Sequence, residues 1–246
     1  MGKRKNRNTA AYYQDPTRQK WIGWLVGGAK VILWTLAYTL IVTLPQLYVM
    51  GGSFLDSTWQ TILGVLSIIY MFAVSYWFYR RYQKKNPENV IPLTWNDILK
   101  DLGIFAGVLV FKMVMSVLMN NIYGAETTVN DEAIFGLLDN NTNILVALNL
   151  GLTVITLAPV MEEIIFRGMI SKGMFKDKSF SAAIILSSIF FSSMHLSGNI
   201  ISFIIYAGIG AACFMAYWRK KNINDAIFIH FLNNLPGAIM IIFGLF

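Results

Sequence analysis

The stretch "NILVALNLGLTVITLAPVMEEIIFRG", residues 143–168, carries no charge until it reaches Glu162, Glu163 and Arg167. Its uncharged part, 143–161, lies within the length of about 17–25 residues that a helix needs to cross the hydrocarbon of a bilayer. The segment therefore predicts a membrane-spanning helix with two acids at its end. Because ionisable groups in a membrane cost several kcal/mol, these acids each require a partner or a function.

The same kind of apolar run recurs along the chain. Hydrophobic residues make up 56% of the 246 residues and charged residues only 13%, whereas soluble domains carry about 25% charged residues. The mean hydropathy is +0.54. We expect an all-α, polytopic transmembrane helical bundle of about seven helices, with eight as the upper count. The runs are 31–50, 58–79, 102–122, 143–161, 180–196, 199–218 and 223–246.

The placement of basic residues supports this topology. A net charge of +7 could indicate nucleic-acid binding, but the lysines and arginines form no single patch. They cluster within 3–20, 80–100, 167–178 and 219–221, whereas the intervening loops 51–57, 123–142 and 197–198 hold none. This positive-inside pattern predicts a cytoplasmic N-terminus, with 1–22 as a basic tail. We expect a multi-pass protein of a bacterial plasma membrane with no nucleic-acid partner.

Five ionisable residues within the apolar runs or at their ends stand out: Lys112, Glu162, Glu163, His195 and His230. Arg167 follows Glu163 by four residues, which is the favourable order for a helical ion pair. Glu162 is turned about 100° from Glu163, so one arginine does not serve both acids. An unpaired carboxylate in an apolar place is a strong base when ionised, although a hydrogen bond to a neighbouring helix would explain it equally well.

The chain's two histidines both lie in apolar runs. Phe191 precedes His195 by four residues, so its ring can pack beside the imidazole. His230 and Asn234 share one helix face in the same way, and two adjacent donors suit an oxygen that gains negative charge. Cys213 is the single cysteine, so neither a disulfide nor a cysteine-based metal site is expected.

Known intramembrane peptidase motifs narrow the chemistry. The sequence has no H-E-x-x-H helix, no Gly-Asp pair and no G-x-S-x-G elbow. Ser192 and Ser193 lie too near His195 on one helix for a serine nucleophile, and small hydroxyls suit helix packing. Two readings remain: glutamate and histidine acting on water, or a metal held by Glu162, His195 and His230.

Three motifs in order resemble one family. E-E-x-x-x-R at 162–167, F-x-x-x-H at 191–195 and H-x-x-x-N at 230–234 resemble the motifs of the CPBP family, the CAAX protease and bacteriocin-processing intramembrane endopeptidases, also called Abi. The resemblance covers about 140–240. It implies a catalytic helical core over 140–246, preceded by transmembrane helices in 23–123 that match no motif.

The resemblance implies a role for each matched residue. Glu162 would be the general base, helped by His195, and Glu163 with Arg167 would be a supporting pair. His230 and Asn234 would form the oxyanion hole, with Asn233 as the substitute if Asn234 is silent. Phe191 would pack beside His195. The prenyl-endopeptidase branch of the family is regarded as a metal-independent glutamate type, and asparagine is a poor zinc ligand. We therefore favour no cofactor, and zinc is the alternative.

The family implies substrates that are membrane-embedded or lipidated, such as precursors of peptide pheromones, bacteriocins or prenylated proteins. Two other functions stay open: a catalytically silent membrane scaffold or immunity protein, and a transporter in which Lys112 and Glu162 form a coupled ion pair. A straight helix from Phe180 would place His195 too far outward to meet Glu162. We therefore expect the helix of Glu162 to continue past Arg167, the "LSGN" turn to be submerged, and the site to be a recess open to the cytoplasm.

Overall fold

The computed structural model describes residues 16–138 and 143–244, and no strand occurs in those ranges. Six helices are long and apolar enough to cross a membrane, and a shorter apolar helix accompanies them. The predicted all-α polytopic bundle is therefore confirmed. The helices are α2 (Pro16–Gly51), α3 (Ser57–Lys85), α4 (Trp95–Tyr123), α5 (Val129–Phe135), the composite fourth span, α8 (Phe180–Ser193), α9 (Ile200–Lys220) and α10 (Ile223–Phe243), with short turns η1 (Gly52–Phe54) and η2 (Pro87–Asn89).

The fourth span alternates between two kinds of helix. It consists of α6 (Ile144–Leu152), the π-helical η3 (Thr153–Leu157), α7 (Ala158–Glu163) and the π-helical η4 (Ile164–Met174). As expected, the helix continues past Arg167, so Glu162 and Glu163 lie inside the span and not at its end.

Capping residues set the ends of several spans. Asp56 accepts from the backbone of Thr58 and Trp59 at the start of α3. Capping boxes begin α4, at Thr94 and Asp97, and α9, at Asn199 and Ser202. These side chains satisfy backbone N–H groups that have no partner within the helix.

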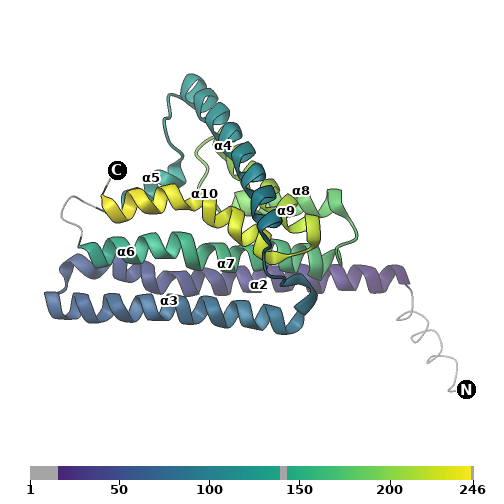
Figure 1. The fold of residues 1–246 in the computed structure, drawn as a ribbon, viewed down its shortest axis with the longest axis horizontal. Coiled ribbons are helices and arrows are strands. Elements are labelled where there is room, and N and C mark those ends of the chain that lie inside the picture. Colours follow the sequence, from purple (N-terminus) through teal and green to yellow (C-terminus); the bar gives the residue numbers. More distant parts are fainter. Residues whose placement is uncertain (1–15, 139–142, 245–246) are drawn as a thin grey trace, which may run out of the picture.

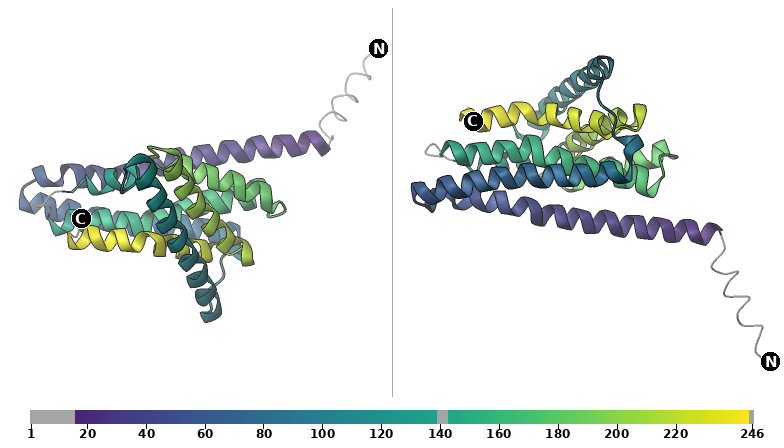
Figure 2. Two further views of the ribbon diagram at one scale, coloured as in Figure 1. Left: turned by 90° about the horizontal axis from the view of Figure 1, so that it is seen from above. Right: turned by 60° about the horizontal axis from the view of Figure 1, so that its bottom comes forward.

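Several of the long helices share one common direction. In Figures 1 and 2, α2, α3, the fourth span and α10 run alongside one another, while α4 crosses them steeply. The start of α2 and the end of α10 lie at opposite ends of the molecule (Figure 1). The fourth span and α9 form the centre, because 50% and 61% of their apolar windows are buried, against 11% for α2 and α4.

The fifth predicted run, 180–196, forms a shorter helix than expected. At about 1.5 Å per residue, the 14 residues of α8 extend about 21 Å, less than the roughly 30 Å of a hydrocarbon core. The chain turns back within residues 194–199 and enters the capping box of α9, which packs along α8. His195 therefore lies in a turn between two packed helices.

Ion pairs hold the start of α4 against the centre. Arg219, at the end of α9, bonds to Asp101 of α4 at 2.6 Å and also to Asp225 of α10. Lys220 bonds to Asp97 at 2.6 Å. The basic cluster 219–221 is thus partly neutralised by acids of α4 and α10. The same ion pairs hold the start of α4 against α9, although most other residues of α4 face outward.

Candidate active site

The two adjacent acids on α7 are both buried. Glu163 is fully buried and Glu162 is 8% exposed. The span is π-helical on both sides of α7, and such segments change which side chains face the helix's neighbours. Consecutive carboxylates thereby meet different helices, as the 100° separation predicts.

One carboxylate oxygen of Glu163 accepts hydrogen bonds from two side chains. Its Oε1 accepts from Arg167 Nη1 at 3.0 Å, which is the predicted helical ion pair, and from His230 Nδ1 at 2.7 Å. Arg167 is fully buried, and its Nη2 donates to the Gly210 carbonyl at 2.6 Å. Charged groups keep a place in an apolar interior only when paired and hydrogen-bonded. Glu163 therefore orients His230 as well as neutralising Arg167.

Glu162 has a different environment. Its Oε1 accepts from the hydroxyl of Tyr38, on α2, at 2.6 Å. Its Oε2 is buried and has no hydrogen-bond partner in the described structure, as is also true of Glu163 Oε2, so the two acids differ in the charge of their partners. A buried acceptor without a partner costs about 1–3 kcal/mol, which is tolerated where a ligand or water is to be held. Glu162 thus presents one fixed and one available oxygen.

Tyr38 was missed by sequence reasoning. The only signal is a phenol within an apolar run, since a buried tyrosine hydroxyl usually needs a partner. Its partner lies 124 residues away in the chain. Neither spacing nor motif connects the two, so only the packing of α2 against the fourth span reveals the contact.

His195 is held in one orientation. Its Nδ1 lies 2.8 Å from the Phe191 carbonyl oxygen, which can only accept, so Nδ1 carries a proton and Nε2 is left as an acceptor in the neutral ring. The imidazole packs between Phe191, at 4.5 Å, and Tyr206, at 4.5 Å and 18°. The predicted packing of Phe191 beside His195 is present.

Phe191 also connects the two histidines. Its ring meets that of His230 edge-on at 5.5 Å, and the guanidinium of Arg167 lies 4.9 Å from the same ring. Arg167, His195 and His230 therefore surround one aromatic side chain from α8. No hydrogen bond joins Glu162 directly to His195, although both residues are described.

Asn234 bonds to a carbonyl that its neighbouring helix leaves unpaired. In η3 the Ala158 N–H bonds to Thr153 O, five residues back. The next such bond would join residue 159 to Val154, but Pro159 has no N–H. Asn234 Nδ2 takes its place, donating to Val154 O at 2.9 Å. The amide nitrogen keeps its second N–H, and Asn234 Oδ1 accepts from Asn233 Nδ2 at 3.0 Å.

The donor atoms do not gather as the metal hypothesis predicts. In the described part of the chain, the group of potential ligands whose atoms all lie within 4.8 Å of one another is Glu163, Cys213 and His230. Glu162 and His195 are not in it. Glu163 Oε1 already carries the guanidinium of Arg167, so a cation bound to the same carboxylate would lie close to a like charge, which opposes metal binding. The donor set fits zinc poorly.

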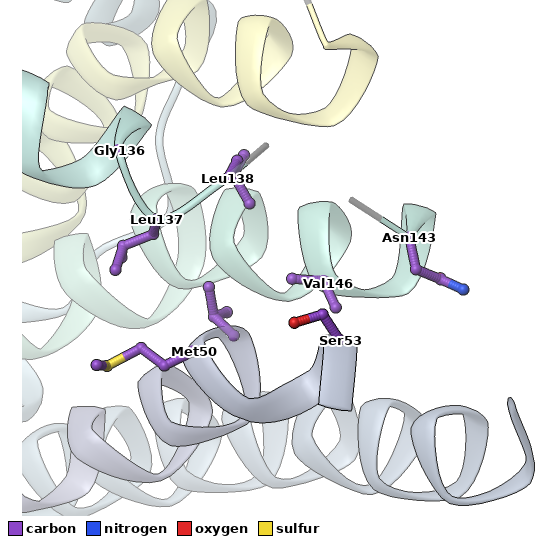
Figure 3. A pocket seen from close by; sticks show the side chains of 8 residues that line it. Met50, Ser53, Gly136, Leu137, Leu138, Asn143 and Val146 are labelled. Carbon is purple, nitrogen blue, oxygen red and sulfur yellow. The ribbon is translucent and has the colours of Figure 1, made fainter. Parts of the chain in front are cut away.

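Two cavities lie away from these residues. One, of about 160 Å³, is lined by the end of α2, the segment after α5 and the start of α6 (Figure 3). The other, of about 360 Å³, is an apolar groove between α4 and α9, lined by Gly103, Ile104, Gly107, Val108, Phe111, Gly208, Ala212 and Met215. Neither includes a predicted catalytic residue, so the expected recess open to the cytoplasm stays a prediction.

Comparison with known proteins supports the motif reading. Residues 144–236 match the family described as type II CAAX prenyl endopeptidase Rce1-like. This match confirms the predicted CPBP resemblance over the four helical segments of the core, three of which carry the motifs. No curated protein and no solved structure matches the chain.

Proposed function

Since residues 144–236 match the CAAX endopeptidase family, we propose that the protein is an intramembrane endopeptidase acting on membrane-associated peptides or lipidated protein ends. The observation that carries this proposal is the division between the two acids. Each acid has one buried oxygen without a partner, but the bonded oxygen of Glu163 is neutralised by Arg167 and also meets His230, whereas that of Glu162 meets only the neutral hydroxyl of Tyr38. A base of this kind is what water-mediated peptide hydrolysis requires.

The proposed first step is removal of a proton from water. Glu162 Oε2 takes the proton while Tyr38 holds Oε1 at 2.6 Å. His195 orients the water through Nε2, because its Nδ1 is occupied by the Phe191 carbonyl. The hydroxide oxygen bonds to the scissile carbonyl carbon, and the carbonyl oxygen takes up the displaced electron pair. When the C–N bond breaks, Glu162 returns its proton to the leaving amine.

The oxyanion is stabilised from α10. Asn234 offers the N–H that Val154 does not use. His230 donates through Nε2 when both ring nitrogens carry a proton, and the Glu163 carboxylate, 2.7 Å from Nδ1, holds the ring in place. Removing one such donor costs about 3–4 kcal/mol of barrier, a hundredfold to thousandfold in rate.

The groove between α4 and α9 suits the apolar chain of a lipidated substrate. It is lined by apolar side chains and by glycines, and Gly103 and Gly107 face open space. Phe111, at one end of the lining, precedes Lys112, whose side chain reaches Asn233 of α10. An apolar chain in the groove would keep the attached peptide near the site residues of α10.

The test uses purified protein in nanodiscs and a panel of internally quenched peptides. The panel contains a farnesylated C-a-a-X end, an acylated end and an unmodified apolar end. Wild type is compared with Glu162→Gln and Glu162→Ala, with and without a chelator. We expect cleavage that both substitutions abolish and the chelator leaves intact. Cleavage that persists without Glu162, or a wild type that cleaves no member of the panel, contradicts the proposal. Loss with chelator that zinc restores contradicts its metal-free form.

A further inference from the structure

Lys112 is a cation in the middle of the apolar helix α4, in a half of the chain that carries no family motif. It forms no ion pair with any described residue. Its Nζ donates to Asn233 Oδ1 on α10 at 3.2 Å. A lysine within a membrane helix is costly and usually finds an acid or reaches the interface. Lys112 instead meets a neutral amide that neighbours a proposed catalytic residue.

The contact begins a chain of three hydrogen bonds. Lys112 donates to Asn233, Asn233 Nδ2 donates to Asn234 Oδ1 at 3.0 Å, and Asn234 Nδ2 donates to Val154 O at 2.9 Å. An ammonium can only donate and a backbone carbonyl can only accept. Both amide orientations are therefore set from the two ends, because reversing either amide would bring two donors or two acceptors together.

We propose that Lys112 is a positioning residue for the oxyanion donor Asn234, acting through Asn233. The inference rests on the proposed function, because it assigns Lys112 to the transition state of that reaction. Lys112 holds Asn233 in the orientation that gives Asn234 Oδ1 a donor. The Asn234 NH₂ group is then directed to Val154 and, through its second N–H, to the substrate oxygen.

The charge of Lys112 acts in the same direction as the geometry. Hydrogen bonds in a chain polarise one another, and a cation at the donor end strengthens each following donor. The gain is largest when the last acceptor is an oxyanion, so it appears in the transition state more than in the bound substrate. Lys112 should therefore affect kcat, with little effect on KM.

The experiment measures kcat and KM of full-length protein in nanodiscs with the best-cleaved quenched peptide. Lys112→Met should lower kcat by about tenfold to a hundredfold, less than the loss of the donor itself, with KM unchanged. Lys112→Arg keeps a donor-only cation and should restore most of the rate. Lys100→Met is the matched control, since Lys100 is an exposed lysine on the same helix, and it should match wild type.

Asn233→Asp tests whether Lys112 acts through the chain of hydrogen bonds to Asn234, here called the relay, or only needs a partner for its own charge. Aspartate accepts from Lys112 as asparagine does, but it has no N–H for Asn234 Oδ1. If Lys112 needs only a partner, this variant keeps its activity, and that result would overturn the proposal. The relay instead predicts a kcat as low as that of Lys112→Met with an unchanged unfolding temperature.

A double-mutant cycle completes the test. In the Asn234→Ala background, followed by single-turnover cleavage, Lys112→Met should cause no further loss, because the donor it positions is gone. An equal fold-loss in both backgrounds, or a rise in KM alone, overturns the positioning role. Glu162→Gln distinguishes the two proposals. If this variant retains cleavage, the proposed function fails. If it abolishes cleavage but Lys112→Met causes the same fold-loss with and without Asn234→Ala, only the positioning role of Lys112 is refuted.

Discussion

Replacing Arg167 by methionine should separate stability from catalysis at the paired acid. Arg167 is fully buried and bonds to Glu163 at 3.0 Å and to the Gly210 carbonyl at 2.6 Å. Arg167→Met leaves the Glu163 carboxylate without its counter-ion inside an apolar bundle. Breaking a buried pair from one side costs about 3–5 kcal/mol. At about 2–4 °C per kcal/mol for a chain of this size, the unfolding temperature should fall by roughly 6–20 °C.

The matched variant is the double substitution Glu163→Leu with Arg167→Met. Removing both charges leaves no unpaired ion, so the double variant should unfold at a higher temperature than Arg167→Met alone. It should nevertheless cleave about a hundredfold to thousandfold more slowly than wild type, because leucine offers His230 Nδ1 no acceptor. Scanning fluorimetry in detergent gives the unfolding temperatures, and quenched-peptide cleavage gives the activity. The reasoning would be refuted by an Arg167→Met protein as stable as wild type. It would also be refuted by a double variant that is less stable than Arg167→Met.

Three further variants test the contacts around the site. Tyr38→Phe removes the hydrogen bond to Glu162, worth about 1.5–3 kcal/mol for a charged acceptor. Both kcat/KM, at least tenfold, and the unfolding temperature should therefore fall, because Glu162 Oε1 loses its partner; an unchanged rate would remove Tyr38 from the site. Pro159→Ala supplies the N–H that Val154 O lacks, so it should stabilise the protein while lowering kcat, because Asn234 loses its acceptor; a rate equal to wild type would contradict this. Gly107→Leu fills open space in the groove and should raise KM for a farnesylated peptide but not for an unmodified one, whereas equal effects on both peptides would exclude the groove as a lipid site.

Much of the fold can be predicted from the sequence, because each membrane helix corresponds to a long apolar run. Each of the seven runs contains a helix, and the Glu163–Arg167 and Phe191–His195 neighbours are local, four residues apart. The length of α8 was overestimated, since hydropathy does not register the turn that precedes the cap at Asn199.

The contacts that were not predicted join helices far apart in the chain. His230 lies 67 residues from Glu163, and Tyr38 lies 124 residues from Glu162. Helical periodicity gives the face on which a residue lies but not the helix which that face meets. The bond from Asn234 to Val154 also depends on the local π-helical geometry before Pro159, which propensities for α-helix do not reveal.

The most direct test of the account compares Glu162→Gln with Glu163→Gln in one single-turnover cleavage assay, with unfolding temperatures measured on the same samples. Each substitution keeps the side chain's shape and removes its charge. The account predicts that Glu162→Gln abolishes cleavage at an unchanged unfolding temperature, whereas Glu163→Gln lowers the unfolding temperature and retains measurable cleavage. Cleavage by Glu162→Gln at a rate near wild type would contradict the assignment of Glu162 as the base.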